Sequence, residues 1–171
     1  RDRALLELLV ASGVRLSEAS NLKRADVDLE NQNAVVSGKG SKERLVLFSS
    51  TASRWIAKYL ESRTDTNPYL FLSIQGKRIS PRTIQRRVAY FSRKAGIEPL
   101  HPHSLRHYFA CRMLDGGLDI FSLQRLLGHS NLSVTSVYLH KNDKQLSKSY
   151  NQAINQGPTS KEEYPSNFLY A

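Results

Sequence analysis

The spacing of hydrophobic residues predicts a mostly helical domain. Leu5, Leu8 and Leu9 recur at helical spacing, and the pattern stops at Gly13. Further helices are predicted over residues 17–30 (short, ending in a polar turn), 50–63, 80–96 (capped by Ser80, with Pro81 in its first turn), 103–117, 119–129 (stopped by Gly128), 131–140 and 144–155. In residues 50–63 one face collects Ala52, Trp55, Ile56, Tyr59 and Leu60, as expected of a helix that packs on a core.

Two segments predict β-structure. Residues 33–48 have β-rich ends around a Gly-Lys-Gly-Ser-Lys turn, which predicts a hairpin, and residues 67–80 predict a short strand and a glycine turn. The expected fold class is therefore α+β, mostly α, with a small antiparallel sheet. Residues 1–156 are interpreted as one folded domain, and the polar residues 157–171, which include two prolines, as a flexible tail.

The composition of the chain limits the classes of partner that it is expected to bind. The 171 residues suit one domain, and 25 Lys and Arg against 15 Asp and Glu give a formal charge of +10. This excess favours a polyanionic partner, with nucleic acid first and an anionic membrane second. It does not indicate an enzyme, because many structural proteins are as basic. No apolar run approaches the length of a membrane span. A membrane is not among the expected partners.

The cysteine content and the first residue bear on location and completeness. Cys111 is the one cysteine, which rules out an internal disulfide and fits a reducing cytoplasm. The chain opens with Arg1 rather than Met, so it is interpreted as a fragment whose N-terminal part is missing.

A set of polar side chains could carry phosphoryl chemistry. The candidates are Arg15, Lys39, His103, Arg106, His129 and Tyr138. Two guanidinium groups can grip phosphate oxygens and stabilise a pentavalent transition state. A histidine can move a proton near neutral pH, a lysine on a turn can protonate a leaving oxygen, and a tyrosine can attack phosphorus to form a covalent ester. The arginines would stabilise the negative charge that a metal ion stabilises in other enzymes, so no metal or cofactor is expected.

The order of these residues resembles the tyrosine recombinases, also called the phage integrase family. The matching elements are Arg, Lys, His-x-x-Arg, "LLGHS" and Thr-x-x-Tyr-x-His, within residues 1–155, and they are most similar to Xer-type and transposon integrase members. The resemblance implies a catalytic domain without the usual N-terminal core-binding domain. Ala19 and Tyr108 depart from the family pattern, which affects the subfamily rather than the chemistry.

The resemblance also implies a role for each residue. Arg15 and Arg106 would bind the scissile phosphate, and Lys39 would protonate the 5′-hydroxyl leaving group. His103 would serve proton transfer with the nucleophile, and His129 would be a second histidine on the phosphate. Tyr138 would form the 3′-phosphotyrosyl link, and Glu18 would support the architecture of the site.

The implied partners are double-stranded DNA at a specific site and further protomers. The family forms a tetramer on DNA by exchanging C-terminal segments, for which Leu146, Tyr150 and Ile154 offer an apolar stripe; packing of this stripe on its own domain is the alternative. A bacterial or archaeal cytoplasm, at the nucleoid, is the expected location. DNA contacts are expected from the helix that follows Ser80, through Ser80, Arg82, Thr83 and Arg86, although a basic helix face is often simply solvated.

Several alternatives remain open. Tyr90, Tyr108 or Tyr150 could replace Tyr138 as the nucleophile, and Lys42 could replace Lys39. His101, His103 and His107 have a metal interpretation, which is disfavoured because no further ligand stands at a suitable spacing. At the level of function, the alternatives are a type IB topoisomerase and a non-catalytic DNA-binding module. The intact set of six residues argues against the second.

Overall fold

The computed structural model describes residues 1–38, 43–98 and 100–128. Its helices are α1 (Asp2–Ser12), α2 (Leu16–Asn21), a 3₁₀ turn (Arg24–Asp26), α3 (Ser50–Glu61), α4 (Pro81–Lys94), α5 (Pro102–Asp115) and α6 (Ile120–Leu127). Its strands are β1 (Val27–Asp28), β2 (Asn33–Ser37) and β3 (Glu43–Leu47). The mostly helical α+β class is confirmed. The helices predicted over residues 131–140 and 144–155 lie outside the described residues.

The helix ends follow the sequence signals. α1 ends at Gly13, which adopts the left-handed conformation (φ 60°). The Ser80 hydroxyl caps α4 by accepting a hydrogen bond from the Thr83 amide at 3.1 Å, and Pro81 occupies the first turn. α6 ends at Gly128, also left-handed (φ 64°). These predicted ends are confirmed.

The sheet is small and antiparallel, in the order β1-β2-β3. The predicted hairpin is confirmed, with Val35 opposite Leu45 and Ser37 opposite Glu43. β1 was not predicted, because a strand of two residues is too short to show an alternating pattern.

The strand predicted within residues 67–80 is wrong. This segment forms only two isolated bridges, Lys23 with Tyr69 and Leu72 with Arg78. Its consecutive apolar residues Leu70 and Phe71 are fully buried, so the apolar run reflects a loop that passes through the core.

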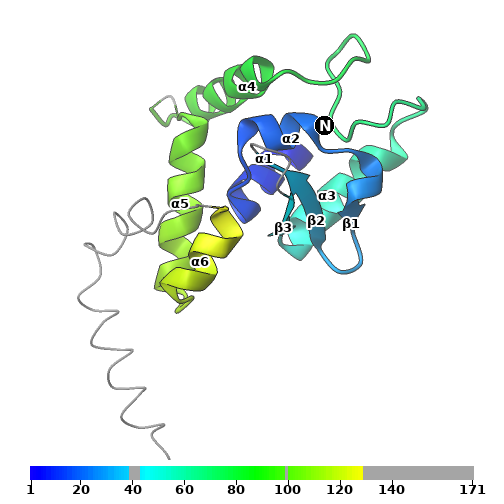
Figure 1. The fold of residues 1–171 in the computed structure, drawn as a ribbon. Coiled ribbons are helices and arrows are strands. Elements are labelled where there is room, and N and C mark those ends of the chain that lie inside the picture. Colours follow the sequence, from blue (N-terminus) through cyan, green and yellow to red (C-terminus); the bar gives the residue numbers. More distant parts are fainter. Residues whose placement is uncertain (39–42, 99, 129–171) are drawn as a thin grey trace, which may run out of the picture.

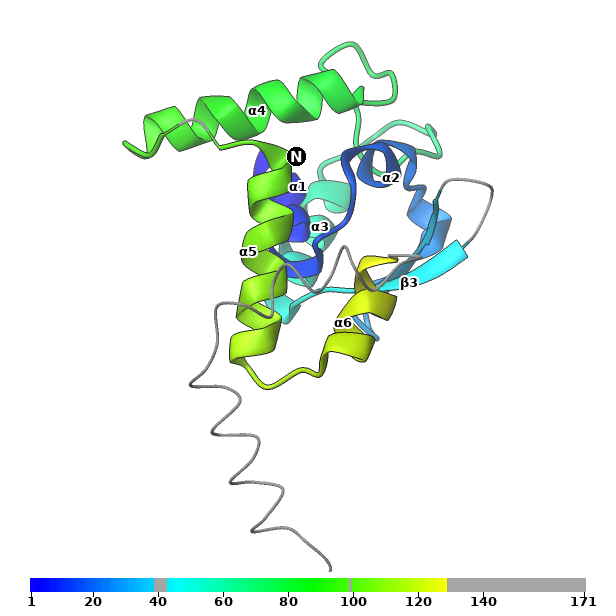
Figure 2. The same ribbon diagram turned by 60° about the vertical axis from the view of Figure 1, so that its left-hand side comes forward.

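α1 lies at the centre of the fold and packs against both α3 and α5 (Figures 1 and 2). α2 packs against α4 and β2, while α6 lies between α5 and β3 (Figure 2). On α3, Ala52, Ile56 and Tyr59 are buried as predicted, and Trp55 and Leu60 are partly buried. A second, smaller apolar cluster joins α5 to α6. No helix in the described ranges is long and apolar enough to cross a membrane.

Candidate active site

Three arginine side chains meet at the C-terminal end of α6. Arg15 Nη2 donates to the Gly128 carbonyl at 2.9 Å, and Arg106 Nη2 donates to the Leu127 carbonyl at 2.5 Å. Arg44 Nη1 donates to the carbonyl of Leu126. The last carbonyls of a helix lack partners within the helix and form the negative end of its dipole. The helix end therefore gathers the positive charges, and it brings together the two arginines that the sequence predicted.

Arg15 is held from its own backbone and from its side chain. It is the N-cap of α2, and its amide donates to Glu18 Oε2 at 2.8 Å while Nη1 donates to Oε1 at 3.0 Å. The Arg15 side chain is nonetheless 39% exposed. An anchored yet accessible guanidinium is suited to receiving an anion from solvent.

Arg106 is more deeply set, at 8% exposure. Its Nη1 donates to the Gly13 carbonyl at 2.5 Å, so the side chain links the end of α1 to the end of α6. Gly13 must be glycine here, because a Cβ atom would lie 2.5 Å from Phe109 Cδ1. Arg106 therefore holds the site together in addition to contributing charge.

Glu18 is the counter-ion at the centre of the cluster. It is 2% exposed, and both of its oxygens also accept from Arg44, at 2.7 Å from Nη2 and 3.3 Å from Nε. Burial alone would raise the pKa of Glu18, but hydrogen bonds and charge from Arg44 and Arg15 outweigh burial and hold the pKa below its ordinary value. Glu18 is thus a fixed negative charge shared by two arginines.

Sequence reasoning missed Arg44. On β3 the inward positions alternate with exposed ones, and Arg44 shares the inward side with the buried Val46. A charged side chain at an inward position of a strand needs a buried partner of opposite charge. The inward position of an arginine in the strand pattern was therefore the signal that could have identified Arg44. The exposed Leu45 and Leu47 obscured it, because they make the outer face of the strand look equally apolar.

The remaining predicted residues are placed less completely. His103 is exposed on the first turn of α5, one turn before Arg106. Lys39, its rival Lys42, His129 and Tyr138 lie outside the described residues.

A hollow of about 260 Å³ separates α2 from the turn end of the hairpin, with Glu18 on one wall and Ser37 and Glu43 on the other.

The basic residues of α4 divide into two groups. Arg82 and Arg86 are exposed, with Ser80 at the capped start of the helix and Thr83 partly buried beside them. Arg87 turns inward instead: it donates to Asp2 at 2.5 Å and lies over the rings of Tyr90 and Phe91, 4.7 and 4.9 Å from their centroids. The predicted DNA-contact residues therefore share an accessible face from which Arg87 is withdrawn.

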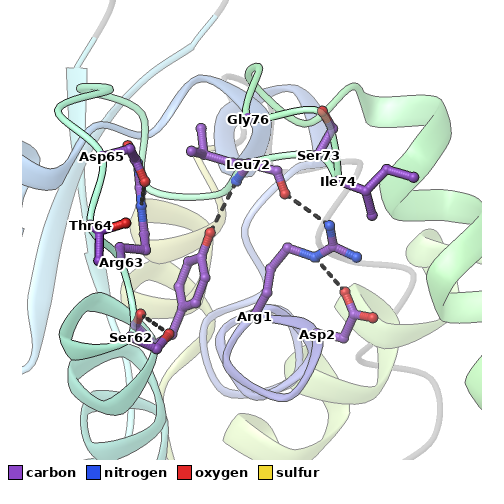
Figure 3. A pocket seen from close by; sticks show the side chains of 11 residues that line it. Arg1, Asp2, Ser62, Arg63, Thr64, Asp65, Leu72, Ser73, Ile74 and Gly76 are labelled. Atoms are coloured by element: carbon purple, nitrogen blue, oxygen red, sulfur yellow. Dashed lines mark hydrogen bonds and ion pairs between the residues drawn. The ribbon is translucent and has the colours of Figure 1, made fainter.

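A larger hollow, of about 470 Å³, lies elsewhere, among the start of α1, the end of α3 and the loop that follows it (Figure 3). Its charged side chains are paired with one another: Arg1 with Asp2 at 2.7 Å and Arg63 with Asp65 at 2.5 Å. Arg63 also donates to the Tyr69 and Leu70 carbonyls, at 2.7 and 2.8 Å. These contacts hold the loop in place, and Arg15, His103 and Arg106, the predicted catalytic residues that the structure describes, do not line this hollow.

On α5, a histidine lies close to the single cysteine of the chain. His107 Nε2 lies 3.6 Å from Cys111 Sγ, one turn along the helix. Within the described residues there is no group of three or more His, Cys, Asp or Glu side chains arranged to hold a metal ion.

Replacing Gly128 with Ala should destabilise the domain. A Cβ there would lie 2.5 Å from Arg44 Cδ and 2.9 Å from Nε, in addition to the strain of φ 64°. Gly76→Ala is the matched control, because Gly76 has φ 72° with open space around it. We expect Gly76→Ala to cost about 1 kcal/mol in urea unfolding, the cost of the left-handed conformation alone, and Gly128→Ala clearly more. Equal losses would show that contact with Arg44 contributes nothing.

Comparison with known proteins gives a consistent result. Residues 1–145 match the model of the phage integrase family. The chain is 44% identical over 157 residues to the tyrosine recombinase XerC of Actinobacillus succinogenes, covering 90% of this chain and 53% of that protein. XerC of Haemophilus influenzae is 45% identical with the same coverage. The chain thus spans about half the length of these curated relatives.

Solved structures agree with the sequence relatives. The crystal structure of XerA recombinase has a TM-score of 0.78 at 39% identity, covering 88% of this chain and 58% of that one. XerH site-specific recombinase, in a post-cleavage complex with palindromic difH substrate, has a TM-score of 0.74 at 28% identity, covering 88% and 45%. The catalytic domain of bacteriophage HP1 integrase shares the fold, with a TM-score of 0.64 at 23% identity over 94% of this chain and 84% of that one. On its sequence and its fold, the chain belongs to the phage integrase family.

Proposed function

We propose that this chain is the catalytic domain of a site-specific tyrosine recombinase that cleaves and rejoins double-stranded DNA. The observation that carries the proposal is the convergence of Arg15 and Arg106 on consecutive carbonyls at the end of α6. His129 is the next residue in the sequence, and Tyr138 follows nine residues later. Relatives named as tyrosine recombinases and a neighbour solved with its DNA substrate support the same activity.

In the proposed reaction the Tyr138 hydroxyl attacks the scissile phosphorus. A new bond from the tyrosine oxygen to phosphorus forms as the bond to the 5′-oxygen breaks, which leaves a 3′-phosphotyrosyl link. His103 takes the tyrosine proton, and Lys39 gives a proton to the departing 5′-oxygen. Arg15 and Arg106, with His129, stabilise the added negative charge on the phosphate oxygens.

Rejoining is the same reaction in reverse. A 5′-hydroxyl attacks the phosphotyrosyl phosphorus, the bond to Tyr138 breaks, and Tyr138 recovers its proton. The ester has kept the free energy of the phosphodiester, so ATP is not required. Arg15 and Arg106 supply the positive charge that a metal ion would otherwise bring. We assign this chemistry to residues 1–156.

The proposal is tested with a nicked suicide duplex. Cleavage releases a short fragment that carries the 5′-hydroxyl, and its loss prevents rejoining and traps the covalent intermediate. The expected result is a protein–DNA adduct that survives denaturation and forms only on duplexes carrying the recombination site. Relaxation of supercoiled DNA without a site requirement would favour a type IB topoisomerase. Retention of DNA without any adduct would favour a binding module.

The exposed face of α4 should contribute to DNA affinity. Arg82→Ala and Arg86→Ala each remove one exposed cation, so each should weaken binding and lower the slope of log affinity against log salt by about 1. Arg87→Ala is the matched control on the same helix. It breaks the pair with Asp2 and should lower stability while leaving the salt slope unchanged. A slope that drops for Arg87→Ala, and not for the other two, would place DNA on a different surface.

A further inference from the structure

Arg44 reaches two parts of the site at once. It is anchored on β3, and its side chain is 11% exposed. From there the guanidinium donates to both oxygens of Glu18, on α2, and to the Leu126 carbonyl at the end of α6. A planar guanidinium with several donors is suited to bridging partners in fixed directions.

Arg15 makes a parallel set of contacts. It also donates to Glu18, at 3.0 Å, and to the end of α6, at the Gly128 carbonyl two residues beyond Leu126. The two arginines therefore flank one carboxylate and one helix end. Arg44 is on the enclosed side, and Arg15, 39% exposed, is on the open side.

Arg15, Glu18 and Arg44 form a charged trio, and its net charge determines how strongly Arg15 can attract an anion. Glu18 carries one negative charge between two guanidinium groups, so the trio keeps a net positive charge. Without Arg44, Glu18 would neutralise Arg15 directly and would compete with a phosphate for its N–H groups. Arg44 shares the carboxylate from the enclosed side, so the charge of Arg15 is only partly compensated.

We propose that Arg44 is a positioning residue for Arg15: by sharing Glu18 and holding the end of α6, it limits how far Glu18 compensates the positive charge of Arg15 and keeps the guanidinium directed toward the scissile phosphate. The proposal rests on the proposed recombinase function and deepens it. Arg44 itself does not touch the DNA in this account. Its effect on the reaction passes through Glu18 and Arg15.

Arg44 lies on β3, five residues after Lys39 in the sequence. A substitution of Arg44 could therefore slow cleavage through Lys39 instead of Arg15, and the experiment has to distinguish these two causes. A DNA substrate with a bridging 5′-sulfur has a leaving group that needs no proton. This substrate rescues any defect that arises from Lys39. It does not rescue a defect in stabilising the phosphate charge.

The experiment measures single-turnover cleavage of a suicide duplex by Arg44→Gln, Arg15→Ala and the double variant, on oxygen and 5′-sulfur substrates. Arg44→Gln should cleave on the order of tenfold to a hundredfold more slowly, with DNA affinity nearly unchanged and without rescue by sulfur. The double variant should be no slower than Arg15→Ala alone, because Arg44 acts through Arg15. Rescue by sulfur, multiplicative defects, or cleavage at the wild-type rate would each overturn the proposal.

Arg44→Lys covers the case in which Arg44→Gln does not fold, as judged by circular dichroism. It keeps the charge but loses the forked geometry, so its defect should be smaller and still non-multiplicative with Arg15→Ala. Multiplicative defects here would also overturn the proposal. A wild-type chain that forms no adduct on any site-bearing duplex would instead remove the proposed function itself, a result distinct from any behaviour of the Arg44 variants.

Discussion

Arg15→Ala should slow DNA cleavage by about 10²–10³, the usual effect of removing one donor that stabilises transition-state charge. The reason is the position of its guanidinium, which is anchored on Glu18 and Gly128 yet partly open to solvent. DNA affinity should fall far less than the cleavage rate, because Arg15 contributes most when negative charge builds up on the phosphate in the transition state. The measurement is single-turnover adduct formation beside an equilibrium binding titration.

Arg54→Ala serves as the control, because Arg54 is an exposed arginine on α3, away from the site. It should leave the cleavage rate unchanged. A fall in affinity as steep as the fall in rate would make Arg15 an ordinary backbone contact. Arg106→Ala is a less selective test, since the Gly13 and Leu127 carbonyls would lose a donor, at about 1–3 kcal/mol for each buried group left unsatisfied.

Glu18→Gln should lower the free energy of unfolding by about 3 kcal/mol, as expected when one partner of a buried ion pair is removed. The neutral amide leaves Arg44 buried without a counter-ion and can accept fewer of the hydrogen bonds that Glu18 receives. The exposed Glu61, on α3, provides the control Glu61→Gln, which should be close to neutral. Urea unfolding of the three proteins makes the comparison, and equal stability for Glu18→Gln would contradict the role given to this carboxylate.

The same variant isolates a pH dependence. Because the folded pKa of Glu18 lies below its ordinary value, its stabilising contribution is complete above the unfolded pKa of about 4.3 and is lost as the pH falls through the folded pKa. The stability difference between wild type and Glu18→Gln should therefore be constant from about pH 6 to 8 and should shrink below about pH 4.3. A difference that grew at acidic pH would show that the folded pKa is raised.

Much of the fold could be predicted from the sequence where local signals are strong. Gly13, Ser80 and Gly128 mark helix ends through backbone conformation and capping, which are local properties. The hairpin follows from two β-rich segments around a glycine turn. The loop through Leu70 and Phe71 was mistaken for a strand because burial on all sides gives the same apolar run in either conformation.

The candidate site shows a similar division. Arg15 pairs with Glu18 at 3.0 Å, a contact that their three-residue spacing at a helix start allows. The meeting of Arg15, Arg44 and Arg106 at one helix end could not be predicted from spacing, because it depends on how α6 packs between α5 and β3. The withdrawal of Arg87 onto Asp2 likewise depends on contact between segments far apart in the chain.

The most direct test of the central claim is to locate the covalent bond. The wild-type chain is trapped on a suicide duplex, digested with protease and nuclease, and the peptide that carries the nucleotide is sequenced by mass spectrometry. We expect a phosphotyrosyl bond at Tyr138, and a Tyr138→Phe variant that folds and binds DNA but forms no adduct. A bond at Tyr90, Tyr108 or Tyr150, or an adduct that persists in Tyr138→Phe, would contradict it.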